Sequence, residues 1–199
     1  MSKDPQDNVG PNQFYVQALL LAEVVKRILS KKADIDLAQK PTITLNPIVE
    51  FRRRMRVSGL GKLDEKTFIS TINFFANEKD EEKEKALGTL IIYIGESFVV
   101  KLFQAMKYPV IDEDEEAAIK DACGTFCNLI AGNFKSGLTQ LGYKELIMSH
   151  FSTYENEILN GVLYPTTQSE LYEVSFHIRG TKRIVAELVM GPLVKADSD

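Results

Sequence analysis

The chain has 199 residues, of which 44% are hydrophobic and 26% charged, and its formal net charge is −4 at pH 7. This composition is typical of globular proteins and excludes a disordered chain, a transmembrane protein with an apolar run of ~20 residues, and a broadly basic nucleic-acid-binding protein. The length suits one sizeable domain, and the polar start lacks the apolar segment of a secretion signal, so we expect a cytoplasmic protein.

The first predicted element is an amphipathic helix that begins after Asn12 and ends at residue 31 or 32. Leu21, Val25 and other apolar residues recur there at helical spacing. Asn12 is a residue type that caps helix N-termini well. Pro41 and Pro47 then mark a change from helix to strand.

Three strands are predicted next, at residues 48–57, 67–75 and 87–94. These stretches are rich in β-branched and aromatic residues, and the second of them partly alternates between apolar and polar positions. We expect them to be antiparallel neighbours. The mixed-charge connector 77–85 is predicted to be a solvated loop or a strand extension.

A short helix is predicted at residues 96–107, ended before Pro109. A long helix follows, which starts in the acidic run 112–116 and ends near Gly142. Three further strands are predicted at residues 144–153, 171–179 and 183–190. A loop with Gly161 and Pro165 separates the first two of them.

The predicted order is therefore α-βββ-αα-βββ. It indicates an α+β domain in which long helices cover an antiparallel β-sheet. We place this domain at residues 12–191, between a flexible lead of residues 1–11 and a polar tail of residues 192–199.

The long helix has one polar stripe and one apolar stripe. With about 100° of rotation per residue, one side gathers Asp121, Thr125, Asn128, Gly132, Lys135 and Thr139. The other side gathers Ile119, Cys123, Phe126, Ile130 and Leu141. We predict that the apolar stripe packs into the core. Gly124 and Gly132 lower helix propensity, so we expect the sheet, a second helix or a docked partner to approach the helix closely at both.

The two cysteines, Cys123 and Cys127, lie four residues apart in this helix. A shared helix disfavours a disulfide, and a metal site would need more ligands. His150 and His177 lie in predicted strands without metal-ligand spacing, so we expect reduced structural thiols and no metal. The basic cluster at residues 52–56 is predicted to be a solvated strand face or a partner contact.

Residues 121–135 read Asp-Ala-Cys-Gly-Thr-Phe-Cys-Asn-Leu-Ile-Ala-Gly-Asn-Phe-Lys. The pattern Asp-Ala-x-Gly-x-x-x-Asn-Leu-Ile-Ala-Gly resembles the active-site helix of the CheC/CheX/FliY family of chemotaxis phosphatases, and is most similar to the CheX type. The family signature is Glu-x-x-Asn followed by an apolar pair, a small residue and Gly. Here Asn128 keeps the Asn, but Thr125 occupies the position of the Glu. The similarity covers residues 12–191 loosely and residues 121–135 sharply.

The resemblance implies a CheX-like fold, a homodimer, and a phosphorylated CheY-type receiver as the partner in two-component signalling. The reaction it implies is hydrolysis of the receiver's aspartyl phosphate. The chain would need no cofactor of its own, because Mg²⁺ is expected on the receiver. The implied catalytic residue is Asn128, which would orient the attacking water. The implied partner-binding residues are Asp121, Thr125, Asn128, Gly132 and Lys135.

Because Thr125 stands where the family has Glu, the sequence leaves more than one function open. A Thr cannot form the charged contact of the family's Glu, and losing one charge-assisted contact weakens an interface by about 1.5–3 kcal/mol. The chain is therefore either a phosphatase or a non-catalytic binding or dimerisation module with a CheX-like fold. Asn128 by itself also fits a solvated side chain, and a partner outside chemotaxis is a third alternative.

Overall fold

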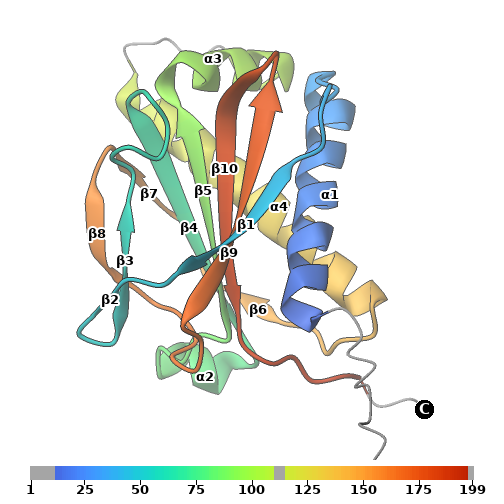
Figure 1. The fold of residues 1–199 in the computed structure, drawn as a ribbon, viewed down its shortest axis with the longest axis vertical. Coiled ribbons are helices and arrows are strands. Elements are labelled where there is room, and N and C mark those ends of the chain that lie inside the picture. The colour runs from blue at the N-terminus through green and yellow to red at the C-terminus, as the bar shows by residue number, and fades with distance from the viewer. Residues whose placement is uncertain (1–11, 110–114, 197–199) are drawn as a thin grey trace, which may run out of the picture.

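The computed structural model describes residues 12–109 and 115–196. Its elements form three layers: a layer of helices, a large β-sheet and a small β-sheet (Figure 1). The helices are α1 (Gln13–Ala33), α2 (Glu78–Glu82), α3 (Glu96–Ala105) and α4 (Glu116–Gln140). The expected α+β class, with an antiparallel sheet covered by long helices, is confirmed.

The large sheet has seven strands, and all its pairs are antiparallel. Its strands are β1 (Thr42–Pro47), β4 (Thr67–Phe75), β5 (Gly88–Gly95), β6 (Ile147–Met148), β7 (Ser152–Glu155), β9 (Glu170–Ile178) and β10 (Thr181–Met190). They are ordered β1-β9-β10-β5-β4-β6, and β7 also pairs with β4. The small sheet is ordered β2-β3-β8, with β2 (Glu50–Phe51), β3 (Arg54–Ser58) and β8 (Ile158–Val162).

Strand β5 explains why the molecule has two apolar layers. All eight of its residues are buried, as expected for a nearly continuous apolar run covered on both faces. Because side chains alternate along a strand, Leu90, Ile92 and Ile94 join the core beneath the helices. Ile91 and Tyr93 join a second cluster, on the side of the small sheet.

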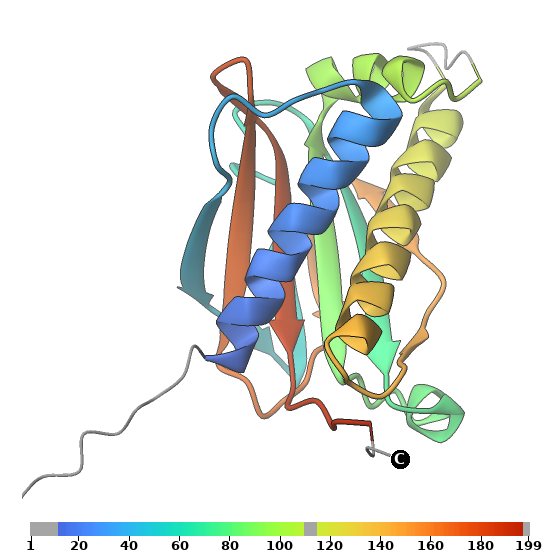
Figure 2. The same ribbon diagram turned by 90° about the vertical axis from the view of Figure 1, so that its right-hand side faces the viewer.

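Helices α1 and α4 lie side by side over one face of the large sheet (Figure 2). Asn12 caps α1 as expected, because its Oδ1 accepts a hydrogen bond from the backbone N–H of Phe14 at 3.0 Å. Gly142 lies just past the C-terminal end of α4 and has a left-handed φ of 82°, which glycine adopts without strain. The acidic positions 112–114 at the expected start of this helix lie outside the described residues.

Residues 48–57 were predicted to form one strand, and this prediction is wrong because they form parts of two strands. The chain turns back at Arg52 and Arg53, whose φ angles are 52° and 60°, and so forms a hairpin between β2 and β3. Two positive φ angles define the type I′ turn, which normally contains Asn and Gly. Because Arg52 and Arg53 are not typical residues of this turn, the sequence did not predict it.

Other differences concern short elements. The connector 77–85 contains the helix α2, capped by the Asn77 side chain, which accepts from the N–H of Asp80 at 3.0 Å. Strand β1 was not predicted, and the residues of β8 were expected to form a loop. The strand predicted at 144–153 is two pieces, β6 and β7. These elements have two to six residues and are too short to show a clear period.

The ends of the domain are partly described. Residues 1–11 of the expected lead lie outside the described residues. Beyond β10, Ala196 donates its N–H to the carbonyl of Gly142 at 2.9 Å, and Lys195 Nζ donates to the carbonyl of Leu141 at 2.7 Å. The described part of the expected tail therefore contacts the end of α4. Among the helices in the described ranges, none combines the length and apolar character needed to cross a membrane.

Candidate functional site

The polar stripe of α4 faces away from the sheet. Asp121, Asn128 and Thr139 are exposed, whereas Thr125, Gly132 and Lys135 are half-buried. The opposite stripe is buried as predicted at Ile119, Cys123, Phe126 and Ile130. Leu141 is the exception, because it lies just past the helix end and is 44% exposed.

The carboxamide of Asn128 is free on this surface. It makes no hydrogen bond to any described residue, and the same is true of the Thr125 hydroxyl. Asn133, five residues further along the helix, differs because its Nδ2 donates to the carbonyl of Leu129 at 2.8 Å. Ser136 and Thr139 likewise donate to carbonyls one turn back. Asn128 thus retains both a donor and an acceptor for a partner.

The two glycines of the motif have different surroundings. A Cβ placed on Gly124 would overlap the ring of Phe151, which lies on the segment between β6 and β7. Close packing is therefore confirmed at Gly124. A Cβ on Gly132 would meet no described atom within 4 Å, so neither the sheet nor a second helix packs closely there, and the expected approach of a docked receiver stays a prediction. Gly132 lies one turn after Asn128 and leaves the helix backbone accessible beside it.

Charged residues flank the exposed face. Lys135 Nζ lies 2.9 Å from Glu145 Oε1, and this hydrogen bond lowers the pKa of the Glu145 carboxyl. Burial and the nearby charge of Asp121 raise the pKa of Tyr108. Asp121 lies seven residues, about 10 Å along the axis, from Asn128. The stripe therefore has an exposed carboxylate at one end and a paired lysine near the other.

The thiols of Cys123 and Cys127 are free and buried beneath this face. Burial raises the pKa of both thiols, and Cys127 Sγ donates to the carbonyl of Ser70 at 3.7 Å. Structural thiols were expected, and a protonated buried Cys is chemically inert. His150 lies between β6 and β7 and His177 lies in β9. In the described part of the chain, no cluster of His, Cys, Asp or Glu fits a metal ion.

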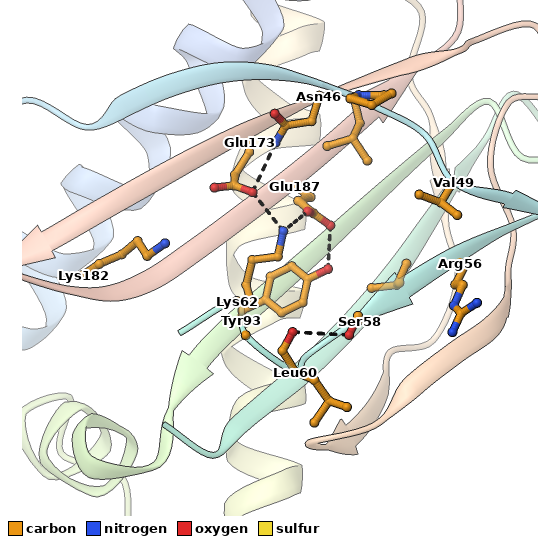
Figure 3. Close-up of a pocket in the computed structure, with 14 residues that line it drawn as sticks. Asn46, Val49, Arg56, Ser58, Leu60, Lys62, Tyr93, Glu173, Lys182 and Glu187 are labelled. Atoms are coloured by element: carbon orange, nitrogen blue, oxygen red, sulfur yellow. Dashed lines mark hydrogen bonds and ion pairs between the residues drawn. The ribbon is translucent and has the colours of Figure 1, made fainter. Parts of the chain in front are cut away.

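Sequence reasoning missed a second polar site, on the opposite face of the sheet (Figure 3). Lys62 Nζ donates to Glu173 Oε2 at 2.9 Å and also to Glu187. Tyr93 donates its hydroxyl proton to Glu187 Oε2 at 2.5 Å. The signal in the sequence was Glu187, a carboxylate inside the apolar run of β10.

Burial and the nearby Glu187 carboxylate change the pKa values of Tyr93 and Lys62 in this second site. Burial, with the charge of Glu187 beside it, raises the pKa of Tyr93 well above its ordinary value. Burial alone would lower the pKa of Lys62, but its contacts with Glu187 and Glu173 outweigh burial and raise it. The raised pKa keeps the Lys62 ammonium protonated near neutral pH.

Residues 81–153 match the family model described as chemotaxis phosphatase CheX. The matched segment begins in α2 and ends in β7, so it includes all of α4. No curated protein matches the chain.

Solved structures have the same fold. A CheC-like superfamily protein from Shewanella sp. PV-4 is 14% identical, with a TM-score of 0.59 over 88% of this chain and 97% of that one. Chemotaxis protein CheX from Vibrio vulnificus is also 14% identical, with a TM-score of 0.58 over 87% of this chain and 98% of that one. The CheX–CheY–BeF3–Mg²⁺ complex from Borrelia burgdorferi is 13% identical, with a TM-score of 0.50 over 88% of this chain and 98% of that one. The family-model match over residues 81–153 confirms the resemblance to the CheX type, and the solved structures confirm the fold.

Proposed function

We propose that this chain, whose residues 81–153 match the CheX family model, binds a phosphorylated CheY-type receiver through the exposed face of α4 and hydrolyses its aspartyl phosphate. The observation that carries the proposal is the free, exposed carboxamide of Asn128 on a helix that the model match covers in full. The Borrelia structure of similar fold contains CheY, which supports a receiver as the kind of partner.

The proposed reaction requires little covalent chemistry from this chain. A water attacks the phosphorus, the bond to the aspartyl oxygen breaks, and the receiver recovers its carboxylate as inorganic phosphate leaves. Asn128 Oδ1 accepts a hydrogen bond from the water, and Nδ2 donates to a phosphoryl oxygen. Positioning the water in line with the scissile bond accounts for the acceleration. The Mg²⁺ belongs to the receiver substrate.

The open surface at Gly132 supports docking at Asn128. A carboxamide reaches only two bonds beyond its Cβ, so the receiver's active site must approach the helix backbone closely. Gly132 leaves space for this approach on the next turn. Asp121 and Lys135 lie further along the same stripe and would contact the rim of the docked receiver.

Thr125 favours a second candidate function, a non-catalytic binding or dimerisation module. Its hydroxyl is half-buried and uncharged, so it cannot pair with a cationic group of the receiver as a Glu would. Without that contact, the receiver still docks but the water is poorly placed, and the fold remains intact. The phosphatase proposal therefore predicts a slower reaction than the full Glu-x-x-Asn signature gives.

The test is the decay of a phosphorylated receiver from the same organism, measured with and without the protein. The variants are Asn128→Ala, Thr125→Glu and the matched control Asn133→Ala, which removes an exposed carboxamide already bonded to its own helix. Acceleration that disappears in Asn128→Ala and persists in Asn133→Ala is the expected result. We expect Thr125→Glu to accelerate decay further, by about tenfold or more.

The same experiment separates the two candidates. Receiver binding with an unchanged phosphate lifetime, together with acceleration in Thr125→Glu, supports the binding module and rejects the phosphatase. Equal acceleration by wild type and Asn128→Ala rejects the proposed role of Asn128. No binding of the receiver in either phosphorylation state rejects both functions.

A further inference from the structure

Two arginines lie on the outer face of the small sheet, which is the layer furthest from helices α1 and α4 (Figure 1). Met55 and Val57 of β3 are buried in the apolar cluster between the two sheets. Because side chains alternate along a strand, Arg54 and Arg56 point to the opposite, outer face. Arg56 is exposed and Arg54 is half-buried, so this face is open to solvent.

Apolar side chains stand beside these arginines. Phe51 pairs with Arg54 in the hairpin, and the carbonyl of Val49 accepts the backbone N–H of Arg56 at 2.7 Å. Residues opposite each other in an antiparallel pair lie on the same face, so each apolar side chain is the neighbour of an arginine. Ile158 of β8 lies on this face too. The three apolar side chains are at least 40% exposed.

The tip of the hairpin adds two exposed arginines, Arg52 and Arg53. The guanidinium of Arg52 lies 5.2 Å from the centre of the Phe51 ring. Both arginines have left-handed φ angles, which favour Asn and Gly, so the stability of the turn does not explain their presence. We call the whole surface the arginine face, and its residues are Val49, Phe51, Arg52, Arg53, Arg54, Arg56 and Ile158.

The arginine face is positively charged, although the chain has a net charge of −4. Arg54 forms an ion pair with Glu84 at 2.6 Å. The carboxylate of Glu50 lies on the other side of β2, where the Tyr164 hydroxyl donates to it. Within residues 12–109 and 115–196, three arginines of the face form no ion pair: Arg52, Arg53 and Arg56. Their unpaired guanidinium groups favour a partner that supplies carboxylates.

The composition of the arginine face is typical of a protein-binding surface. Arginine and aromatic residues are enriched at protein interfaces, whereas Lys, Asp and Glu are depleted. A small anion would leave the exposed apolar side chains in water. A second copy of the chain in a two-fold contact would bring arginine against arginine. The net charge of −4 gives no general attraction to nucleic acid.

We propose that the arginine face docks an acidic segment of a partner protein, in which Asp or Glu residues flank apolar side chains. The carboxylates accept paired N–H donors from the planar guanidinium groups. The apolar side chains of the segment cover Val49, Phe51 and Ile158 and remove them from water. Because both sheets lie between this face and α4, docking here leaves the surface around Asn128 free. The proposal is therefore independent of receiver binding.

Selection of random peptides displayed on phage against the wild-type protein tests the proposal, and fluorescence anisotropy of the synthesised peptides measures their affinities. The double variant Arg52→Asn, Arg53→Gly removes two charges but gives the turn its preferred residues, so lost binding would not reflect unfolding. Arg56→Gln removes the charge on β3, and thermal unfolding verifies that it folds. The matched control, Arg27→Gln with Lys101→Gln, removes two positive charges at exposed positions of α1 and α3.

We expect enriched peptides that combine Asp or Glu with apolar residues. Their affinity should fall by about tenfold or more in the turn variant and in Arg56→Gln, and should stay unchanged in the control. The proposal is overturned if no acidic peptide binds at ~1 mM. It is also overturned if the folded variants bind like wild type, or if the control weakens binding as much as they do.

Sedimentation with vesicles of phosphatidylcholine and phosphatidylserine in equal parts separates a membrane surface from a protein partner. If the proposal is right, the vesicles leave the protein in solution, or sediment it equally well when the face arginines are replaced. Vesicle binding that depends on these arginines, with no acidic peptide enriched, would assign the face to anionic lipid and overturn the proposal.

Discussion

The ring of Phe151 occupies the space beside Gly124 where any other residue would place its Cβ. This contact joins the segment between β6 and β7 to the middle of α4. It explains a glycine in a helix interior, where glycine costs about 1 kcal/mol relative to alanine.

Gly124→Ala should lower stability despite its better helix propensity. Overpacking costs about 1–3 kcal/mol, and the propensity gain offsets about 1 kcal/mol of it. Urea unfolding measures the net loss. In a Phe151→Ala background the clash is absent, so the same substitution should raise stability. A stabilising Gly124→Ala in the wild-type background would contradict the observed packing.

Gly132→Ala should have the opposite effect on stability from Gly124→Ala. It should raise the free energy of unfolding by about 0.5–1 kcal/mol, because the added methyl meets open space. If the receiver docks at Asn128, the bulkier Gly132→Leu should weaken receiver binding while the fold stays intact. Receiver titration and urea unfolding measure the two effects separately. Unchanged receiver affinity in Gly132→Leu would place the docking surface elsewhere.

The contrast between Gly124 and Gly132 shows what could not be predicted from the sequence. Both interrupt the same helix, and helical periodicity says only that Gly132 lies on the polar stripe and Gly124 at its border. What approaches each position depends on the path of residues 149–151, more than fifteen residues away in the chain. The long helices α1 and α4 were predictable because apolar residues recur in each at helical spacing over many residues, and β4 was predictable because it is rich in β-branched and aromatic residues.

The second polar site was missed for a related reason. Lys62 follows β3, whereas its partners Glu173 and Glu187 lie on β9 and β10, so their meeting depends on the strand order of the large sheet. No local spacing encodes that order. Asn128, in contrast, could be proposed as a site residue from the sequence, because its neighbours in the chain carry the motif.

Replacing the arginines of the β2–β3 turn should stabilise the hairpin. Arg52 and Arg53 both adopt left-handed φ angles, which cost a side-chain-bearing residue about 1–2 kcal/mol. The double variant Arg52→Asn, Arg53→Gly introduces the preferred type I′ pair. It also removes the Arg52 contact with the Phe51 ring, worth about 0.5–1 kcal/mol. A net gain of about 1 kcal/mol is expected in urea unfolding, and a loss would show that the turn is not strained.

The two thiols should be unreactive in the folded protein. Cys123 and Cys127 are buried and burial raises their pKa values, so neither access nor ionisation favours attack on a disulfide reagent. Reaction with a chromogenic aromatic disulfide should be slow in buffer and fast in urea. The control Asn133→Cys places a thiol on the exposed part of the same helix and should react at once. Native Cys reactivity equal to that of the control would contradict the buried positions.

Stability should fall as pH rises above about 10, and Tyr93 should cause part of this fall. The pKa of Tyr93 is raised in the folded protein from an ordinary value of 10.0, and that of Lys62 is raised from 10.5. Each group therefore keeps its proton in the folded state at a pH where the unfolded chain releases it. Because the folded state then binds more protons, the free energy of unfolding decreases with rising pH. The contribution is fully present below the unfolded pKa and is lost as pH rises through the folded pKa.

Tyr93→Phe removes the first of these two groups. At pH 8 it should cost about 1–3 kcal/mol, because Glu187 loses the hydroxyl donor at its Oε2. Above pH 10 its stability should fall less steeply than that of wild type, with Lys62 still contributing. Urea unfolding at intervals from pH 8 to pH 11 measures both effects, and Tyr15→Phe, at an exposed ring, should retain wild-type stability at pH 8. Parallel pH profiles for wild type and Tyr93→Phe would show that the Tyr93 hydroxyl does not hold its proton more tightly in the folded state.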